Sequence, residues 1–171
     1  MNFQLLMIDP PWKLYRSYQR AYLHLSDRVP RKMMKATSAF GFLEDALRSI
    51  TAPNHVVLVW VKDRYFENCK IYLDSLGYHY DRLYIWARSR KADGRKRPSA
   101  YLLQFHKGAG IPAAKHFPDP LSFIFGGDPK DTNTKPSRAY AIAETLFPGC
   151  SRIQLFGKLR RKGWHHLTFI S

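Results

Sequence analysis

The stretch from Leu5 to Trp12 constrains the fold most, because it places a continuous apolar run directly before an aspartate, two prolines and a tryptophan. Four consecutive apolar residues are typical of a strand that is covered on both faces of a sheet. Pro10 and Pro11 lack backbone N–H donors, so neither a strand nor a helix can continue through them. The sequence therefore predicts a buried strand that leaves Asp9 at its C-terminal end, where ligands bind in open α/β sheets.

Helical and extended patterns alternate after this stretch. Val56 to Val61 is continuously apolar and rich in β-branched residues, as expected of a central strand, and Pro53-Asn54 predicts a turn before it. Amphipathic spacing predicts helices over Ser38 to Ile50 and Asp63 to Leu76, and Tyr80 to Trp86 follows as a strand. This order predicts an α/β fold with a Rossmann-like, mainly parallel, doubly wound sheet and helices on both faces.

The second half of the chain continues the same alternation. At 171 residues, the chain fits one domain, residues 1–171, with room for a sizeable core. The further expected elements are a strand at Ala100–His106 paired with the strand before it, a short strand at Leu121–Phe125, a helix at Ser137–Phe147, a strand at Arg152–Gly157 and a last strand from Trp164.

The charge balance is strongly basic, with 28 Lys and Arg against 13 Asp and Glu, a formal net charge of +15 and a pI near 10.0. Such a surplus attracts polyanions, of which nucleic acid is the commonest. Two basic segments, Arg88 to Arg97 and Lys158 to Gly163, are expected to be loops that either contact phosphates or form solvated faces. The residues predicted to contact nucleic acid here are Arg88, Arg95, Lys96, Arg97, Arg160 and Arg161.

The remaining composition signals concern the compartment. Cys69 and Cys150 are far apart and belong to no metal-ligand spacing, so both are expected to be free thiols in a reducing compartment. The N-terminus lacks a basic segment before its apolar run, and no apolar run has the length of a membrane span. These features predict a cytoplasmic protein without a membrane partner.

Two later features are suited to holding a cofactor. Lys135 precedes Pro136 and a predicted helix, and a helix N-terminus beside an ammonium can bind an anion such as a carboxylate. Gly157 ends a predicted strand, where the missing side chain would let a cofactor approach the backbone.

The segment Ile8-Asp9-Pro10-Pro11-Trp12 resembles the signature of S-adenosylmethionine-dependent N6-adenine methyltransferases, which include the eukaryotic messenger-RNA enzyme and many bacterial and phage DNA enzymes. Weaker motifs of that family follow in the family's order along nearly the whole chain. They are Trp60, Trp86, Lys107-Gly108, Lys135-Pro136, Pro148-Gly149, Leu155-Phe156-Gly157-Lys158 and Gly163-Trp164.

The resemblance implies a permuted methyltransferase order of strands and methyl transfer from S-adenosylmethionine to the N6 amine of adenine, in DNA by preference or in RNA. No metal is needed for this chemistry. The implied catalytic residues are Asp9, Pro10, Pro11 and Trp12, with Trp12 or Tyr15 stacking on the base. The implied cofactor residues are Ile8, Asp9, Lys135, Phe156, Gly157, Lys158, His166 and Thr168.

The chain departs from the family pattern at three places. Arg88 replaces a lysine after the third strand, Ser99-Ala100 replaces a frequent glutamate, and Leu167-Thr168-Phe169 replaces a segment with asparagine. These departures fit a divergent phage or bacterial member, which would act in the host cytoplasm if phage-encoded. The alternatives are an inactive methyltransferase fold that binds nucleic acid, and a methyltransferase for a small molecule or protein amine, which the charge disfavours. A protein partner or a homodimer could supply sequence selectivity.

Overall fold

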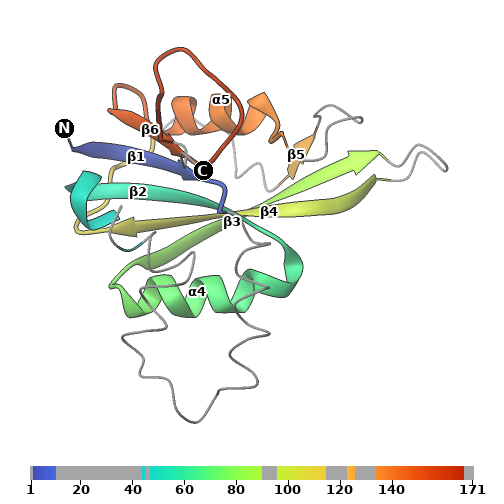
Figure 1. The fold of residues 1–171 in the computed structure, drawn as a ribbon, viewed down its shortest axis with the longest axis horizontal. Helices are drawn as coiled ribbons and strands as arrows, with labels where there is room; N and C mark the ends of the chain where they lie inside the picture. Colours follow the sequence, from blue (N-terminus) through green and yellow to red (C-terminus); the bar gives the residue numbers. More distant parts are fainter. Residues whose placement is uncertain are drawn as a thin grey trace, which may run out of the picture.

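A computed structural model of the chain describes residues 2–10, 44, 47–89, 96–114, 123–125 and 134–167, and only the backbone of residues 88–89, 96–99 and 123–125. Figure 1 shows one sheet with helices on both sides. The elements are β1 Phe3–Ile8, β2 Thr51–Val61, the 3-10 helix η1 Asp63–Tyr65, α4 Phe66–Ser75, β3 His79–Ser89, β4 Lys96–Lys107, β5 Phe123–Phe125, α5 Ser137–Leu146, β6 Arg152–Leu155 and β7 His165–Leu167.

The sheet has seven strands in the order β5-β3-β4-β2-β1-β6-β7. β1 lies between β2 and β6 and is parallel to both, with Ile8 opposite Val59 on one side and Leu155 on the other. β4 runs antiparallel to both of its neighbours, β2 and β3, while the other pairs are parallel. The predicted Rossmann-like, mainly parallel sheet is confirmed, as is the pairing of β4 with the strand before it.

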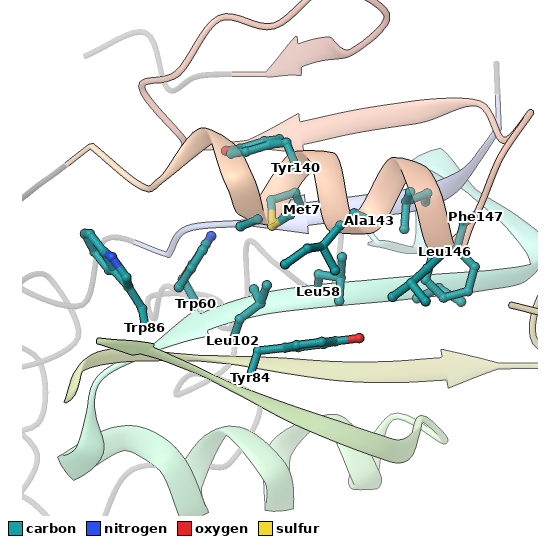
Figure 2. Packing of buried hydrophobic residues seen from close by; sticks show 14 of the residues in the cluster. Met7, Leu58, Trp60, Tyr84, Trp86, Leu102, Tyr140, Ala143, Leu146 and Phe147 are labelled. Atoms are coloured by element: carbon teal, nitrogen blue, oxygen red, sulfur yellow. The ribbon is translucent and has the colours of Figure 1, made fainter. Parts of the chain in front are cut away.

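Alternate residues of β1 enter two separate cores, because successive side chains of a strand point to opposite faces. Leu6 and Ile8 join the cluster that α4 covers, and Leu5 and Met7 join the cluster beneath α5. Figure 2 shows the second cluster, in which residues of α5 pack onto β1, β2 and β4. Helices therefore cover both faces, as predicted. None of the helices within the described ranges has the length and apolarity needed to cross a membrane.

The expected turn at Pro53-Asn54 is wrong, because both residues lie inside β2. The pairing of β2 with β1 shifts register here: Phe3 is opposite Thr51, yet Leu5 is opposite Val56. The intervening residues of β2 form an irregularity in which Pro53 does not have to supply a ladder N–H. The side chain of Asn54 accepts a hydrogen bond from the Ala109 N–H at 2.9 Å, so this irregular segment also supports the end of β4.

The prediction that the basic segment from Arg88 to Arg97 is a loop is wrong at both ends of this segment. Arg88 is opposite Arg97 and Ser89 is opposite Lys96, so these residues belong to β3 and β4. β2 pairs with β4 only as far as Tyr101, and β5 pairs with β3 only as far as Ala87. Beyond these points β3 and β4 continue as a two-stranded ribbon, as Figure 1 shows. In this ribbon the two strands pair with each other, which a charge pattern alone does not indicate.

α4 ends in a Schellman motif, which fixes the direction in which β3 begins. The Gly77 N–H donates to the Asp74 carbonyl at 2.8 Å, and the Tyr78 N–H donates to the Leu73 carbonyl at 3.1 Å. Gly77 has a φ of 79°, a left-handed conformation that side chains with a Cβ disfavour. Gly77 thus ends the helix directly after Leu76, where the sequence predicts its last residue.

Replacement of Gly77 by alanine should lower the free energy of unfolding by about 1 kcal/mol, because the left-handed backbone is strained for any residue with a Cβ. The space itself is open, since the nearest atom to an added Cβ is the Lys107 Cε at 3.8 Å. Gly77→Asn is the matched control and should lose less, because asparagine tolerates this conformation. Urea unfolding checks both variants, and an alanine variant as stable as the wild type would contradict the strain argument.

Candidate active site

Asp9 and Lys135 meet at the C-terminal edge of the sheet. Asp9 directly follows β1, and its N–H donates to the Leu155 carbonyl at 3.0 Å, which extends the β1–β6 ladder by one bond. Lys135 lies two residues before α5, and its Nζ is 3.0 Å from Asp9 Oδ1. The two side chains are only 16% and 14% exposed. Pro10, next in the chain, is also buried.

The carboxyl of Asp9 is under two opposing electrostatic influences. Burial raises its pKa above the ordinary aspartate value, and Lys135, followed by Lys62 and Lys158, acts in the opposite direction. Lys135 Nζ also lies 5.7 Å from the centre of the Trp60 ring. A buried carboxylate among cations is an acceptor that is held in place and that can exchange a proton nearer to neutrality than a free aspartate can.

Besides Arg152, three polar side chains on the α5 face of the sheet carry buried atoms that have no hydrogen-bond partner within the described part of the chain. They are the Tyr140 hydroxyl, both amide atoms of Gln154 and His166 Nδ1. Gln154 is 1% exposed, and in the sheet it stands between Met7 of β1 and His166 of β7. Asp9, two residues beyond Met7, is among the charges that raise the pKa of Tyr140, although burial is the larger cause. Unpaired buried polar atoms are costly, so this region calls for a polar ligand or water.

Figure 2 shows Tyr140 in α5 above Met7, with its hydroxyl pointing away from Phe147. The helix thus turns this hydroxyl toward its own N-terminal end. Because Lys135 lies just before that end, the hydroxyl and the Asp9–Lys135 pair belong to one region of the molecule.

The backbone after β6 turns sharply beside these atoms. Phe156 has a φ of 65°, the one positive value among the described residues other than glycine. A Cβ on Gly157 would lie 1.4 Å from Gln154 Nε2, so the space that this glycine leaves is taken by the Gln154 amide. The ring of Phe156 packs against the cluster on the α4 face. A left-handed bulky residue is strained, and such strain is typical of functional sites.

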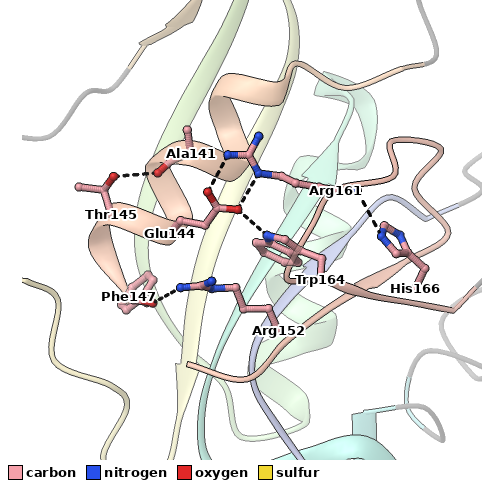
Figure 3. Close-up of polar contacts among 8 residues, drawn as sticks. All are labelled: Ala141, Glu144, Thr145, Phe147, Arg152, Arg161, Trp164 and His166. Atoms are coloured by element: carbon pink, nitrogen blue, oxygen red, sulfur yellow. Dashed lines mark hydrogen bonds and ion pairs between the residues drawn. The ribbon is translucent and has the colours of Figure 1, made fainter. Parts of the chain in front are cut away.

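A hydrogen-bonded network fixes the basic segment after Gly157 onto α5, as Figure 3 shows. Arg161 donates from Nε and Nη2 to the two carboxylate oxygens of Glu144, each at 2.6 Å, and Trp164 Nε1 donates to Glu144 Oε1 at 2.7 Å. The hydrogen bond from Arg161 holds the pKa of Glu144 below its ordinary value. Arg161, predicted to contact nucleic acid, therefore has a structural partner, whereas Arg160 is exposed.

The structure brings together several of the predicted site residues, namely Ile8, Asp9, Pro10, Lys135, Gly157, Lys158 and His166. His166 Nε2 accepts a weak hydrogen bond from the Arg161 N–H at 3.4 Å, and burial lowers the pKa of His166. Pro11, Trp12, Tyr15, Arg95 and Thr168 lie outside the described residues, and only the backbone of Arg88, Lys96 and Arg97 is described.

Sequence reasoning missed Tyr140 and Gln154. A glutamine within the apolar run of β6, three residues before a glycine, was an available signal for Gln154. The tyrosine gave none, because an aromatic residue at helical spacing is ordinarily part of the core.

Comparison with known proteins identifies the family. The MT-A70 family model matches residues 3–168. An MT-A70-like protein of Medicago truncatula is 22% identical over 178 residues, which cover 97% of this chain and 26% of that protein. An N(6)-adenosine-methyltransferase MT-A70-like protein of Drosophila melanogaster is 25% identical over 164 residues, which cover 92% of this chain and 24% of that protein. The chain spans about a quarter of the length of these curated relatives. The chain belongs to the MT-A70 family.

Proposed function

We propose that this protein transfers a methyl group from S-adenosylmethionine to the exocyclic N6 amine of adenine in nucleic acid, with DNA favoured over RNA. The observation that carries the proposal is the contact between Asp9 and Lys135 at the C-terminal edge of the sheet. These residues are far apart in the sequence, and they belong to the Asp-Pro-Pro-Trp and Lys-Pro motifs, which have the clearest chemical roles. Membership of the MT-A70 family supports a methyltransferase, and the name of the fly relative specifies N6-adenosine.

S-adenosylmethionine fits the side chains around this edge. Its carboxylate suits the Lys135 ammonium, and its hydroxyls and amino groups suit the unpaired atoms of Tyr140, Gln154 and His166. When bound, the cofactor supplies an electrophilic methyl group on a sulfonium. Contacts to it from Ile8, Phe156, Lys158 and Thr168 stay predictions of the motif resemblance.

The mechanism assigns positioning and acceptor roles to the chain's own residues. The N6 lone pair is delocalised into the adenine ring, so the amine must be held in a geometry that exposes it. The Asp9 carboxylate and the Pro10 carbonyl would accept its two N–H bonds, while Lys135 fixes the orientation of Asp9. Alignment of this kind can supply up to roughly 7–11 kcal/mol. Because burial raises its pKa, Asp9 is also suited to accept the proton that N6 loses.

Incubation with labelled S-adenosylmethionine and separate DNA, RNA and nucleoside substrates, followed by nucleoside mass spectrometry, tests the proposal. N6-methyladenosine or its deoxy form is the expected product. Nucleic-acid binding without transfer to any substrate would instead favour an inactive binding protein.

Replacement of Lys135 by alanine should weaken cofactor binding by about 1–3 kcal/mol, the usual range for a charge-assisted hydrogen bond. Arg138→Ala is the matched control, because it removes an exposed cation from the first turn of α5. Calorimetric titration with S-adenosylmethionine and with its demethylated product measures both variants. Equal losses in the two would mean that Lys135 makes no specific contact with the cofactor.

Replacement of Asp9 by alanine should lower the methyl-transfer rate by at least ~100-fold, because a preorganised acceptor is removed. Truncation also leaves the Lys135 ammonium without its carboxylate partner, so the melting temperature is measured to show that the variant is folded. Asp9→Asn keeps the shape and removes the charge, and it should be similarly slow if the carboxylate is required. Nucleic-acid affinity should persist in both. Unchanged transfer by a folded alanine variant would place the catalytic centre elsewhere.

The methyl-transfer rate should fall in acid with a midpoint above the ordinary aspartate pKa of about 3.9. The reason is that burial raises the pKa of Asp9 and that only its ionised form is the acceptor. Because the pKa of Asp9 is higher in the folded than in the unfolded protein, its contribution to folding stability is fully present below the unfolded-state pKa. That contribution is lost as the pH rises through the folded-state pKa. Acid inactivation through Asp9 therefore does not require unfolding. Lys135→Gln removes an opposing charge and should move the midpoint to still higher pH. Single-turnover rates against pH measure this, and a midpoint unmoved in that variant would argue against Asp9.

A further inference from the structure

A pocket of about 450 Å³ lies on the α5 side of the sheet, and it is lined almost entirely by cations. Its walls come from α5, from the start of β6 and from the segment between β6 and β7. The lining residues are Glu144, Arg152, Arg160, Arg161 and Lys162. Four positive side chains thus surround one negative side chain.

The single acid of this pocket is already fully engaged. Both oxygens of Glu144 accept hydrogen bonds from Arg161, and Trp164 adds a third. Glu144 therefore neutralises one cation and fixes the position of its segment, as Figure 3 shows. Among the described residues, Arg152, Arg160 and Lys162 form no ion pair with a carboxylate, although the charge of Arg152 also lowers the pKa of Glu144.

Arg152 provides an independent sign that an acceptor is expected here. Its Nη2 donates to the Phe147 carbonyl at 3.3 Å, which holds the guanidinium in place. Its Nε is buried and has no hydrogen-bond partner within the described part of the chain. Buried donors are almost always paired, so a positioned guanidinium with an unpaired N–H is arranged to receive an anion.

The position of the pocket indicates which kind of anion it binds. Arg152 lies three residues before Leu155, whose carbonyl binds the Asp9 N–H, so it stands about 10 Å along β6 from the proposed catalytic edge. One nucleic-acid strand carries a charge about every 3.4 Å along its axis. A strand whose adenine is held at Asp9 can therefore place a flanking phosphate near the pocket.

We infer that Arg152, Arg160, Arg161 and Lys162 form a binding pocket for a backbone phosphate that flanks the target adenine. This inference rests on the proposed function. It adds Arg152 and Lys162 to the residues expected from sequence, and it gives Arg161 the additional role of anchoring the pocket to α5. Arginine forks suit phosphate oxygens better than isolated lysines do.

Salt-dependent binding of a single-stranded, adenine-containing oligonucleotide tests the pocket. The exposed pair Arg160→Gln/Lys162→Gln should reduce affinity by ~10-fold at low salt and reduce the slope of log K against log salt by about one unit for a lost phosphate contact. Arg48→Gln/Lys70→Gln removes the same charge from the helical residues 47–50 and from α4, which lie on the other face of the sheet, and is the matched control. Equal effects in the two double variants would overturn the inference.

A second measurement locates the phosphate. Oligonucleotides with one neutral methylphosphonate at successive positions should bind the wild type less tightly at a single flanking position. That penalty should disappear in Arg152→Gln, whose melting temperature reports any loss of folding, and should remain in the control. Two results would overturn the phosphate assignment. One is that no position of the methylphosphonate weakens binding. The other is that a polyglutamate peptide displaces the bound oligonucleotide while free oligonucleotide does not.

Methyl transfer to free adenosine separates this inference from the proposed function, because a nucleoside has no phosphate. Wild type and pocket variants with equal transfer to the nucleoside and unequal affinity for the oligonucleotide would support both. Methyl transfer to the nucleoside, together with the same oligonucleotide affinity in the wild type and the pocket variants, would overturn the phosphate pocket but not the proposed reaction. No transfer, with the position-dependent penalty intact, would overturn the proposed reaction but leave the phosphate site.

Discussion

The position of β1 between two parallel neighbours is the constraint on which the rest of the structure depends. A strand paired on both edges and covered on both faces must consist of apolar residues, and Leu5, Leu6, Met7 and Ile8 are completely buried. Its C-terminal end then has to leave the sheet at the edge where the loops of β2 and β6 also emerge. Asp9 occupies that point, and the prolines after it prevent the strand from continuing.

The ion pair at this edge is better explained by function than by stability. Taking two charges out of water costs energy that their attraction seldom exceeds, so buried pairs are weak evidence for stabilisation. Asp9 shows this directly, since burial outweighs its three neighbouring lysines in setting the direction of its pKa shift. The strained Phe156 and the unpaired atoms of Tyr140 and Gln154 add further unfavourable terms nearby. Such terms concentrate where a protein positions groups for a ligand.

The strands, the helices α4 and α5 and the central pair of site residues were predictable because their signals are local. An apolar run before Pro10, or Lys135-Pro136 before a helical pattern, needs only neighbouring residues. Partners across the fold leave no such signal. Nothing near Arg161 in the sequence indicates Glu144, and pairing with β1 overrides the turn tendency of Pro53-Asn54. The basic segment after Trp86 looked like a loop because charge says nothing about pairing between its own two halves.

The placement of β1 also affects how the chain is made. β1 is synthesised first, but β6 and α5, which cover one of its edges and one of its faces, come from the last third of the chain. Until that part is available, a central strand exposes unpaired N–H and C=O groups together with Leu5 and Met7, the surface that other strands add to during aggregation. A chain shortened before α5 would keep that surface permanently, because β1 would then be the edge strand of the remaining sheet.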